Sequence, residues 1–141
     1  MREILFRGKT TKKEQEIHAF HNVWVEGDLI KNRYKWHIHP KSNCFRSEKE
    51  LAKCMIAHEV IPETVGQFTG LTDKNGKKIF EGDIIKLYLR DDVTTVGEIR
   101  YSEEDCRFKF WEDFEYPYGF DITTPFEVIG NIHDNPDLYG E

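Results

Sequence analysis

The sequence predicts a mainly β protein with one short helix in an α+β N-terminal part and a small β-barrel in the C-terminal part. Three features predict this class: short segments of alternating apolar side chains, a central Asn-Gly hairpin signal, and one well-marked helical pattern. We expect residues 1–62 to form a β-rich region that includes the helix, and residues 63–141 to form the barrel domain that includes the central hairpin. The length of 141 residues suits one domain or two very small ones.

The central hairpin is predicted from Asn75-Gly76, because both residues tolerate the positive φ angles of a type I′ turn. Gly82-Asp83 indicates a second turn or bulge that leads into a strand over residues 84–89. We expect turn chemistry to explain these Gly and Asp residues; the alternative is that the loop is a contact surface.

The N-terminal region is expected to contain strands over residues 2–7, 17–30 and 33–39, with a polar loop over residues 8–14 and an interruption at Gly27-Asp28. Ser47 and Glu50 have the spacing of a helix capping box, and an apolar stripe follows them, so we predict a helix over about 48–58. His58 lies on that stripe and is expected to be a packed histidine at the helix end. A catalytic dyad of Cys54 and His58 is the less favoured alternative, because both lie on the packed stripe.

The C-terminal region is expected to contain strands over residues 96–101, 106–111 and 126–132, separated by polar or acidic turns. An aromatic segment over residues 114–121 is too broken by Pro and Gly for a central strand. It either folds its rings over the barrel or forms an exposed patch for a partner. The residues of that candidate partner-binding patch are Trp111, Phe114, Tyr116, Tyr118 and Phe120.

A basic strand near residues 31–41 is the candidate nucleic-acid-binding surface, formed by Lys31, Arg33, Lys35, His37, His39 and Lys41. His37 and His39 share one face of the predicted strand, but no carboxylate or cysteine follows before Pro40 to complete a metal site. The three cysteines have no paired spacing, which argues against a disulfide framework and a cysteine zinc site. We therefore expect no metal, no cofactor and no catalytic residue.

Several motifs resemble one known family. They are residues 65–76 (VGQFTGLTDKNG), residues 79–84 (IFEGDI), residues 127–136 (EVIGNIHDNP) and, more loosely, residues 6–8 with residues 24–30. Together they resemble the YopX family, small proteins encoded by bacteriophages and prophages. The resemblance implies a mostly β protein that ends in a small SH3-like barrel, of phage origin, with no established activity and no catalytic residue to carry over.

The charge is divided unevenly along the chain. Residues 1–65 contain 12 Lys and Arg against 9 Asp and Glu, a balance of +3, whereas residues 66–141 contain 8 against 17, a balance of −9. An acidic C-terminal half disfavours duplex DNA there and leaves open a basic protein partner or contact between copies of the chain.

The favoured function is a non-enzymatic accessory protein that binds itself, as a homo-oligomer, and an unidentified phage or host protein. A nucleic-acid-binding module is the second candidate and an enzyme with an unrecognised site is the third. No apolar run has the ~20 residues of a membrane span, and the N-terminus is too short and too charged for a signal peptide, so we expect the bacterial cytoplasm and no membrane partner.

Overall fold

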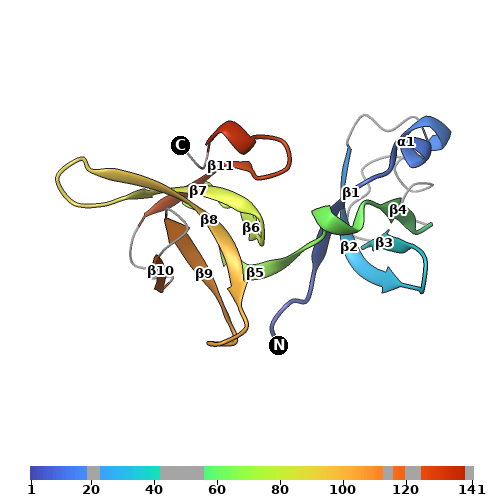
Figure 1. Ribbon diagram of the computed structural model, residues 1–141, viewed down its shortest axis with the longest axis horizontal. Helices are drawn as coiled ribbons and strands as arrows, with labels where there is room; N and C mark the ends of the chain where they lie inside the picture. The colour runs from blue at the N-terminus through green and yellow to red at the C-terminus, as the bar shows by residue number, and fades with distance from the viewer. Residues whose placement is uncertain (19–22, 42–55, 113–115, 120–124, 139–141) are drawn as a thin grey trace. The chain divides into compact units, whose positions relative to one another are not determined.

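The computed structural model describes residues 1–18, 23–41, 56–112, 116–119 and 125–138. The chain divides into two compact units, Met1–Gln67 (unit 1) and Phe68–Glu141 (unit 2), whose elements are labelled in Figure 1. Antiparallel strands dominate both units, and α1 is the only α-helix in the described part of the chain. The mainly β class with one short helix is therefore confirmed.

Unit 1 is built on an antiparallel sheet with the strand order β4-β3-β2-β1-β5. From β1 to β4, successive strands along the chain are neighbours in the sheet, as in a meander, whereas β5 pairs with β1. Thr10 forms an additional bridge with Val60, so β4 has backbone partners in β3 and at the end of β1. The elements are β1 (Phe6–Lys9), β2 (Trp24–Lys31), β3 (Trp36–Pro40), β4 (His58–Val60), the 3-10 helix η2 (Pro62–Thr64) and the start of β5 (Gly66–Thr72).

The interruption predicted at Gly27-Asp28 is wrong, because β2 runs straight through both residues. Gly27 pairs with Phe6 on one side and with Pro40 on the other. A Cβ atom at this position would lie 1.9 Å from the carbonyl oxygen of His39. The glycine thus permits a close approach of two backbones within the sheet. A glycine inside a strand can mark such an approach as well as a bulge or a bend.

Helix α1 (Lys12–His18) occupies a segment where the sequence led us to expect a polar loop and the start of a strand. The hydroxyl Oγ1 of Thr11 accepts a hydrogen bond from the amide N of Glu14 over 3.3 Å, which makes Thr11 the N-cap. Thr11 and Glu14 have the same spacing as Ser47 and Glu50, so the sequence contained the signal for this N-cap.

The helix predicted over about 48–58 lies mainly outside the described residues, including its proposed cap Ser47. Its last residues are described and are not helical: Ile56 lies in a bend and His58 begins β4. The prediction of His58 as a helix-end residue is therefore wrong, since strand pairing with Ile38 determines its backbone conformation.

The core of unit 1 contains the buried side chains of Leu5, Ile38 and Val60. Ile38 and Val60 come from adjacent strands, β3 and β4, and alternate along them with half-buried residues. Two polar residues, Thr10 and His58, are buried with them. Their polar atoms therefore need partners inside the unit, and the Thr10 hydroxyl donates to the carbonyl oxygen of Val23 over 2.8 Å.

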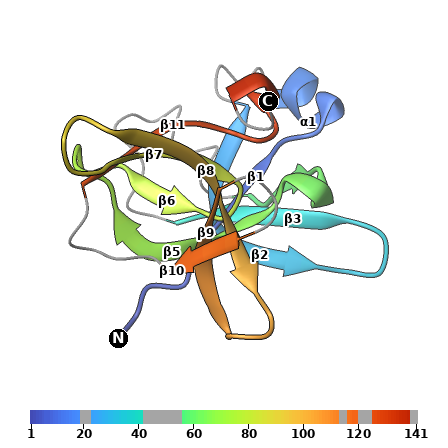
Figure 2. The same ribbon diagram turned by 60° about the vertical axis from the view of Figure 1, so that its left-hand side comes forward.

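Unit 2 contains a five-stranded antiparallel sheet with the order β10-β9-β8-β7-β11. β5 continues past Gln67 and pairs with β6 through Phe68 and Thr72. Figure 2 gives a second view of these strands. The described strands form antiparallel sheets and no closed barrel, so the SH3-like detail of the prediction is not confirmed. The elements are β6 (Lys78–Phe80), β7 (Asp83–Tyr88), β8 (Thr94–Ser102), β9 (Arg107–Glu112), β10 (Tyr116–Gly119), β11 (Phe126–Asn131) and the 3-10 helix η3 (Pro136–Leu138).

The hairpin between β5 and β6 lies where Asn75-Gly76 predicts it, but its turn is of a different type. Asp73 pairs with Lys77 through an N–H···O bond of 2.8 Å, which leaves a three-residue loop. In this loop only Gly76 has a positive φ angle, 80°. A type I′ turn would need a positive φ at Asn75 as well, so the connection is the three-residue type with glycine in the left-handed position.

The core of unit 2 lies on one face of the five-stranded sheet. Phe110 of β9 pairs with Ile99 of β8, and Ile85 of β7 pairs with Val128 of β11, so these side chains share that face. Alternation along each strand produces this arrangement, as the sequence predicts. The buried cluster is Ile79, Ile85, Ile99, Phe110, Phe126 and Val128.

Candidate functional site

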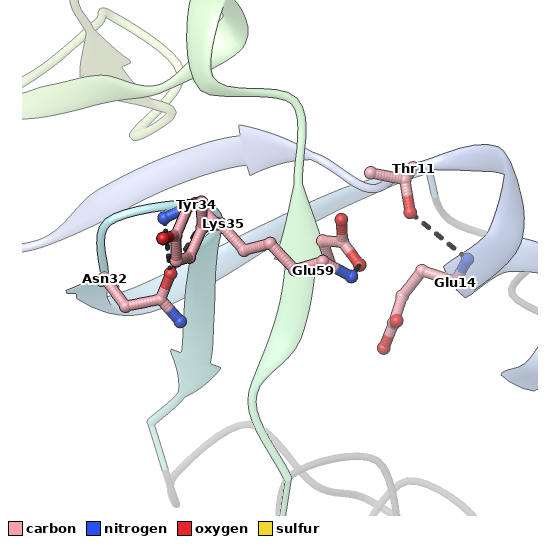
Figure 3. Close-up of polar contacts among 6 residues, drawn as sticks. All are labelled: Thr11, Glu14, Asn32, Tyr34, Lys35 and Glu59. Carbon is pink, nitrogen blue, oxygen red and sulfur yellow. Dashed lines mark hydrogen bonds and ion pairs between the residues drawn. The ribbon is translucent and has the colours of Figure 1, made fainter.

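The turn between β2 and β3 presents the most exposed aromatic ring among the described residues. Tyr34 lies at this turn with 84% of its surface accessible. The Asn32 side chain stabilises the turn, because its Oδ1 accepts hydrogen bonds from the amide N atoms of Tyr34 (2.9 Å) and Lys35 (2.7 Å). The backbone N–H of Asn32 also donates to the backbone carbonyl of Lys35 over 3.1 Å. Figure 3 shows this arrangement. Such side-chain hydrogen bonds hold a turn in one conformation.

Two cationic residues, Lys31 and Arg33, lie close to Tyr34 in the sequence. The ammonium group of Lys31 lies 3.9 Å from the centroid of the Trp36 ring, and the guanidinium of Arg33 lies 5.8 Å from that of Tyr34. Neither Lys31 nor Arg33 forms an ion pair with a described residue, and both are exposed. We call Lys31, Arg33 and Tyr34 the β2–β3 tip. It combines an aromatic ring with two cations on a rigid turn.

The other residues of the predicted basic surface do not join this tip. Lys35 forms an ion pair of 3.1 Å with Glu59 of β4, as Figure 3 shows. The ammonium of Lys41 donates to the carbonyl of Ile4 over 3.0 Å and lies 3.8 Å from the Glu3 carboxylate. Two of the predicted cations are thus already neutralised within unit 1.

His37 and His39 are half-buried in β3. In the sheet His37 is paired with Ile30 and Glu59, and His39 with Asp28. In the described part of the chain no three His, Cys, Asp or Glu residues are placed to hold a metal ion together. The two histidines therefore belong to a mixed polar sheet face rather than to a continuous cationic one.

The predicted aromatic patch lies only in part within the described residues. Trp111 is half-buried in β9, with the Arg100 guanidinium 5.7 Å from its ring centroid. Its indole N–H is buried and has no acceptor among the described residues. Tyr116 and Tyr118 belong to β10, where only the backbone is described; Phe114 and Phe120 lie outside the described residues. The patch remains a prediction.

A buried pair of titratable residues in unit 1 was not anticipated. Nδ1 of His58 lies 2.9 Å from Oε1 of Glu14, and the two side chains are 0% and 13% exposed. The pair joins α1 to β4. The backbone reinforces this junction, since the amide of Thr11 donates to the carbonyl of Glu59 over 3.1 Å. Because β4 and α1 are far apart in sequence, only the fold reveals the pair. Cys54, the proposed thiol partner of His58, lies outside the described residues.

The acidic residues of the central motifs have structural partners. Asp73 is buried, and its carboxylate accepts hydrogen bonds from the amide N atoms of Asn75, Lys77 and Val128, at 2.9, 2.9 and 3.0 Å. Burial acts to raise the pKa of Asp73, but these amide hydrogen bonds, with the nearby Lys77 charge, lower it below its ordinary value. Asp83 is also buried, and its Oδ2 accepts from the amide of Phe80 over 2.8 Å.

A second polar group surrounds Tyr88 in unit 2. The Tyr88 hydroxyl donates to Oε2 of Glu127 over 2.8 Å, and the Lys74 ammonium lies 3.3 Å from the same oxygen. The Tyr88 hydrogen bond, followed by that of Lys74, lowers the pKa of Glu127. Contacts with Tyr88 and then Glu127 raise the pKa of Lys74. Together these contacts join the β5–β6 turn to β7 and β11, which is a structural role.

The motif over residues 65–76 and the motif over residues 127–136 thus meet in space. Asp73 and Lys74 belong to the first, and Glu127 and Val128 to the last, and the hydrogen bonds above connect them. A comparison with family models matches residues 5–139 to one described as YopX protein. The chain belongs to the YopX family. The resemblance read from the motifs is therefore confirmed over nearly the whole chain.

This YopX-family chain is also similar in fold to a solved structure, the crystal structure of protein EF1440 from Enterococcus faecalis. The TM-score is 0.57 with 22% sequence identity, over 99% of this chain and 100% of that one. No curated protein has a significantly similar sequence. Among the described residues, no helix is long and apolar enough to cross a membrane.

Proposed function

We propose that this YopX-family chain is a non-enzymatic phage or prophage accessory protein that acts in the bacterial cytoplasm by binding other proteins or copies of itself. The observation that carries the proposal is the β2–β3 tip, where Tyr34 is 84% exposed on a turn held by Asn32. Tyr and Arg are the residue types that contribute most to protein interfaces. A preformed turn also lowers the entropy lost when a partner binds.

The charges around Tyr34 indicate what kind of partner fits. Lys31 and Arg33 are exposed and have no described ion-pair partner, so an acidic protein surface would gain by approaching them. Lys35 is already paired with Glu59 and is expected to contribute less. The proposed site is therefore small, aromatic and cationic.

A pull-down from nuclease-treated bacterial lysate tests this function. The bait is the full chain, compared with the variants Tyr34→Ser and Arg33→Ala. Ile17→Ser serves as the matched control, because Ile17 is also an exposed apolar residue of unit 1 and lies on α1. Loss of a captured protein in the two tip variants but not in the control supports the proposal. If all three variants still capture the protein, the contact does not involve the β2–β3 tip.

Nucleic acid binding is the second candidate, and the same tip favours it. Tyr34 could stack on an unpaired base while Lys31 and Arg33 contact phosphates. The ion pairs of Lys35 and Lys41 weaken this candidate, because the affinity of a protein for nucleic acid phosphates grows with the number of free cations. Titration with single- and double-stranded DNA at two salt concentrations tests it. Binding that persists after Lys31, Arg33 and Lys35 are all changed to Ala would exclude this surface.

A further inference from the structure

The turn between β7 and β8 has an unusual backbone for its residues. Asp91 and Asp92 both have positive φ angles, 59° and 60°. The amide of Leu89 donates to the carbonyl of Val93 over 2.8 Å, and the amide of Val93 donates to that of Arg90 over 3.3 Å. The turn over residues 90–93 therefore has positive φ angles at both central residues, as in a type I′ turn, for which Asn-Gly is the preferred sequence. The bond between Leu89 and Val93 leaves three residues in the connection. Figure 1 shows the hairpin extending from its sheet as a two-stranded ribbon.

The surface of this turn is both apolar and acidic. Leu89 and Val93 are 46% and 55% exposed, and Asp91 and Asp92 lie between them. Neither carboxylate forms an ion pair with a described residue. We call Leu89, Asp91, Asp92 and Val93 the β7–β8 tip. Two aliphatic side chains flanking two carboxylates are a surface that an aromatic residue with two neighbouring cations would complement.

The β2–β3 tip has that composition. Its Tyr34 ring is exposed, and Lys31 and Arg33 precede it in the sequence by three residues and by one. The wider charges agree with this match. Unit 1 carries 12 Lys and Arg against 9 Asp and Glu, and unit 2 carries 8 against 17. With these net charges, unit 1 of one copy should be attracted electrostatically to unit 2 of another copy.

We infer that the β2–β3 tip of one copy docks on the β7–β8 tip of a second copy. The Tyr34 ring packs on Leu89 and Val93, while Lys31 and Arg33 approach Asp91 and Asp92. This rests on the proposed function and identifies the partner of its site as the chain itself. Each copy carries both surfaces, so two copies can exchange the contact reciprocally in a closed dimer, or successive copies can repeat it in a ring or an open chain.

The contact is expected to be weak for one pair of copies. Two turn tips bury less than the ~1,600 Å² of a standard interface. Its charges lie at the surface, where salt screens them within about 10 Å at 0.1 M. Association should therefore appear at high protein concentration and low salt.

Sedimentation equilibrium on the full chain at low and high salt tests the inference. The variant K31E/R33E reverses one tip, and K12E/K13E makes the same change of charge on the exposed first turn of α1. The variant D91N/D92G removes the other tip's carboxylates and suits the turn geometry, so it should not unfold. E103Q/E104Q removes the same number of carboxylates from the exposed β8–β9 turn.

The expected result is that K31E/R33E and D91N/D92G each weaken self-association by ~10-fold or more, while both controls keep it. A mixture of K31E/R33E with D91N/D92G retains one intact interface per pair and should form a 1:1 complex that grows no further. Monomers at every concentration, or equal effects of tip and control variants, would overturn the inference. A protein captured through Tyr34 in the lysate experiment would leave the proposed function standing in that case.

Discussion

The Asp73 carboxylate accepts a hydrogen bond of 3.0 Å from the amide N of Val128, 55 positions away in the sequence. Val128 lies in β11 at an edge of the five-stranded sheet, and Asp73 follows β5. One side chain therefore closes the β5–β6 turn and also satisfies a donor of an edge strand. This connection gives the central motif of the family a structural explanation.

Replacing Asp73 by Ala should destabilise the chain strongly. Three amide donors lose a charged acceptor, and hydrogen bonds to charged groups each contribute roughly 1.5–3 kcal/mol, so we expect a loss of about 3 kcal/mol or more. Urea unfolding, followed by tryptophan fluorescence, measures it. Asp137→Ala is the control, since Asp137 is exposed. Equal midpoints for the two variants would contradict the role of Asp73.

The pH dependence of stability should report the same carboxylate. The pKa of Asp73 in the folded chain lies below its ordinary value of 3.8. Asp73 therefore contributes stability that is fully present above that value and is lost as pH falls through the folded pKa. The difference in unfolding free energy between the parent and Asp73→Asn should be largest near neutral pH and shrink toward pH ~2. If this free-energy difference instead grows on acidification, the folded pKa of Asp73 is raised and the prediction is wrong.

The β7–β8 turn should become more stable when its residues match its backbone. Asp91→Asn with Asp92→Gly places the preferred type I′ pair at φ angles of 59° and 60°. We expect a gain of about 1 kcal/mol in unfolding free energy, because glycine removes the steric cost of the left-handed conformation. Thermal unfolding measures the change. A loss of stability would mean that the Asp side chains have partners within the fold.

The Glu14–His58 pair should be sensitive to removal of either partner. Glu14→Ala takes the 2.9 Å acceptor from a fully buried imidazole and is expected to cost about 2 kcal/mol. Glu14→Gln retains an oxygen acceptor and should cost less. A double-mutant cycle with His58→Phe separates the pair energy from the loss of packing. Additive effects would show that the two side chains do not interact.

Gly27→Ala should disrupt the sheet of unit 1. The added Cβ would lie 1.9 Å from the His39 carbonyl oxygen and 2.9 Å from the Cα of Pro40, so the strands must separate. Overpacking of this kind costs roughly 1–3 kcal/mol. Gly76→Ala tests the cost of backbone conformation instead, because an added Cβ would meet no atom within 4 Å and only the φ of 80° is unfavourable for alanine. Unfolding curves for the two variants distinguish steric contact from backbone conformation.

The sequence by itself determined the mainly β class, the position of the central hairpin and the family. Side chains alternate with a period of two in any strand, so the burial of Ile85, Ile99 and Phe110 follows from local pattern. The motif around Asp73 was equally visible, as was the cap formed by Thr11 and Glu14, which was overlooked. These features depend on residues that are close together in the chain.

The tertiary structure decided the rest. It placed His58 in a strand against Glu14, and it continued β2 through Gly27. It paired Lys35 with Glu59 and left Tyr34 exposed next to Arg33, which has no ion-pair partner among the described residues. Each of these depends on a partner that is distant in sequence. Local propensity carries no information about such partners, because the free energy of long-range pairing and burial exceeds the small preferences of single residues.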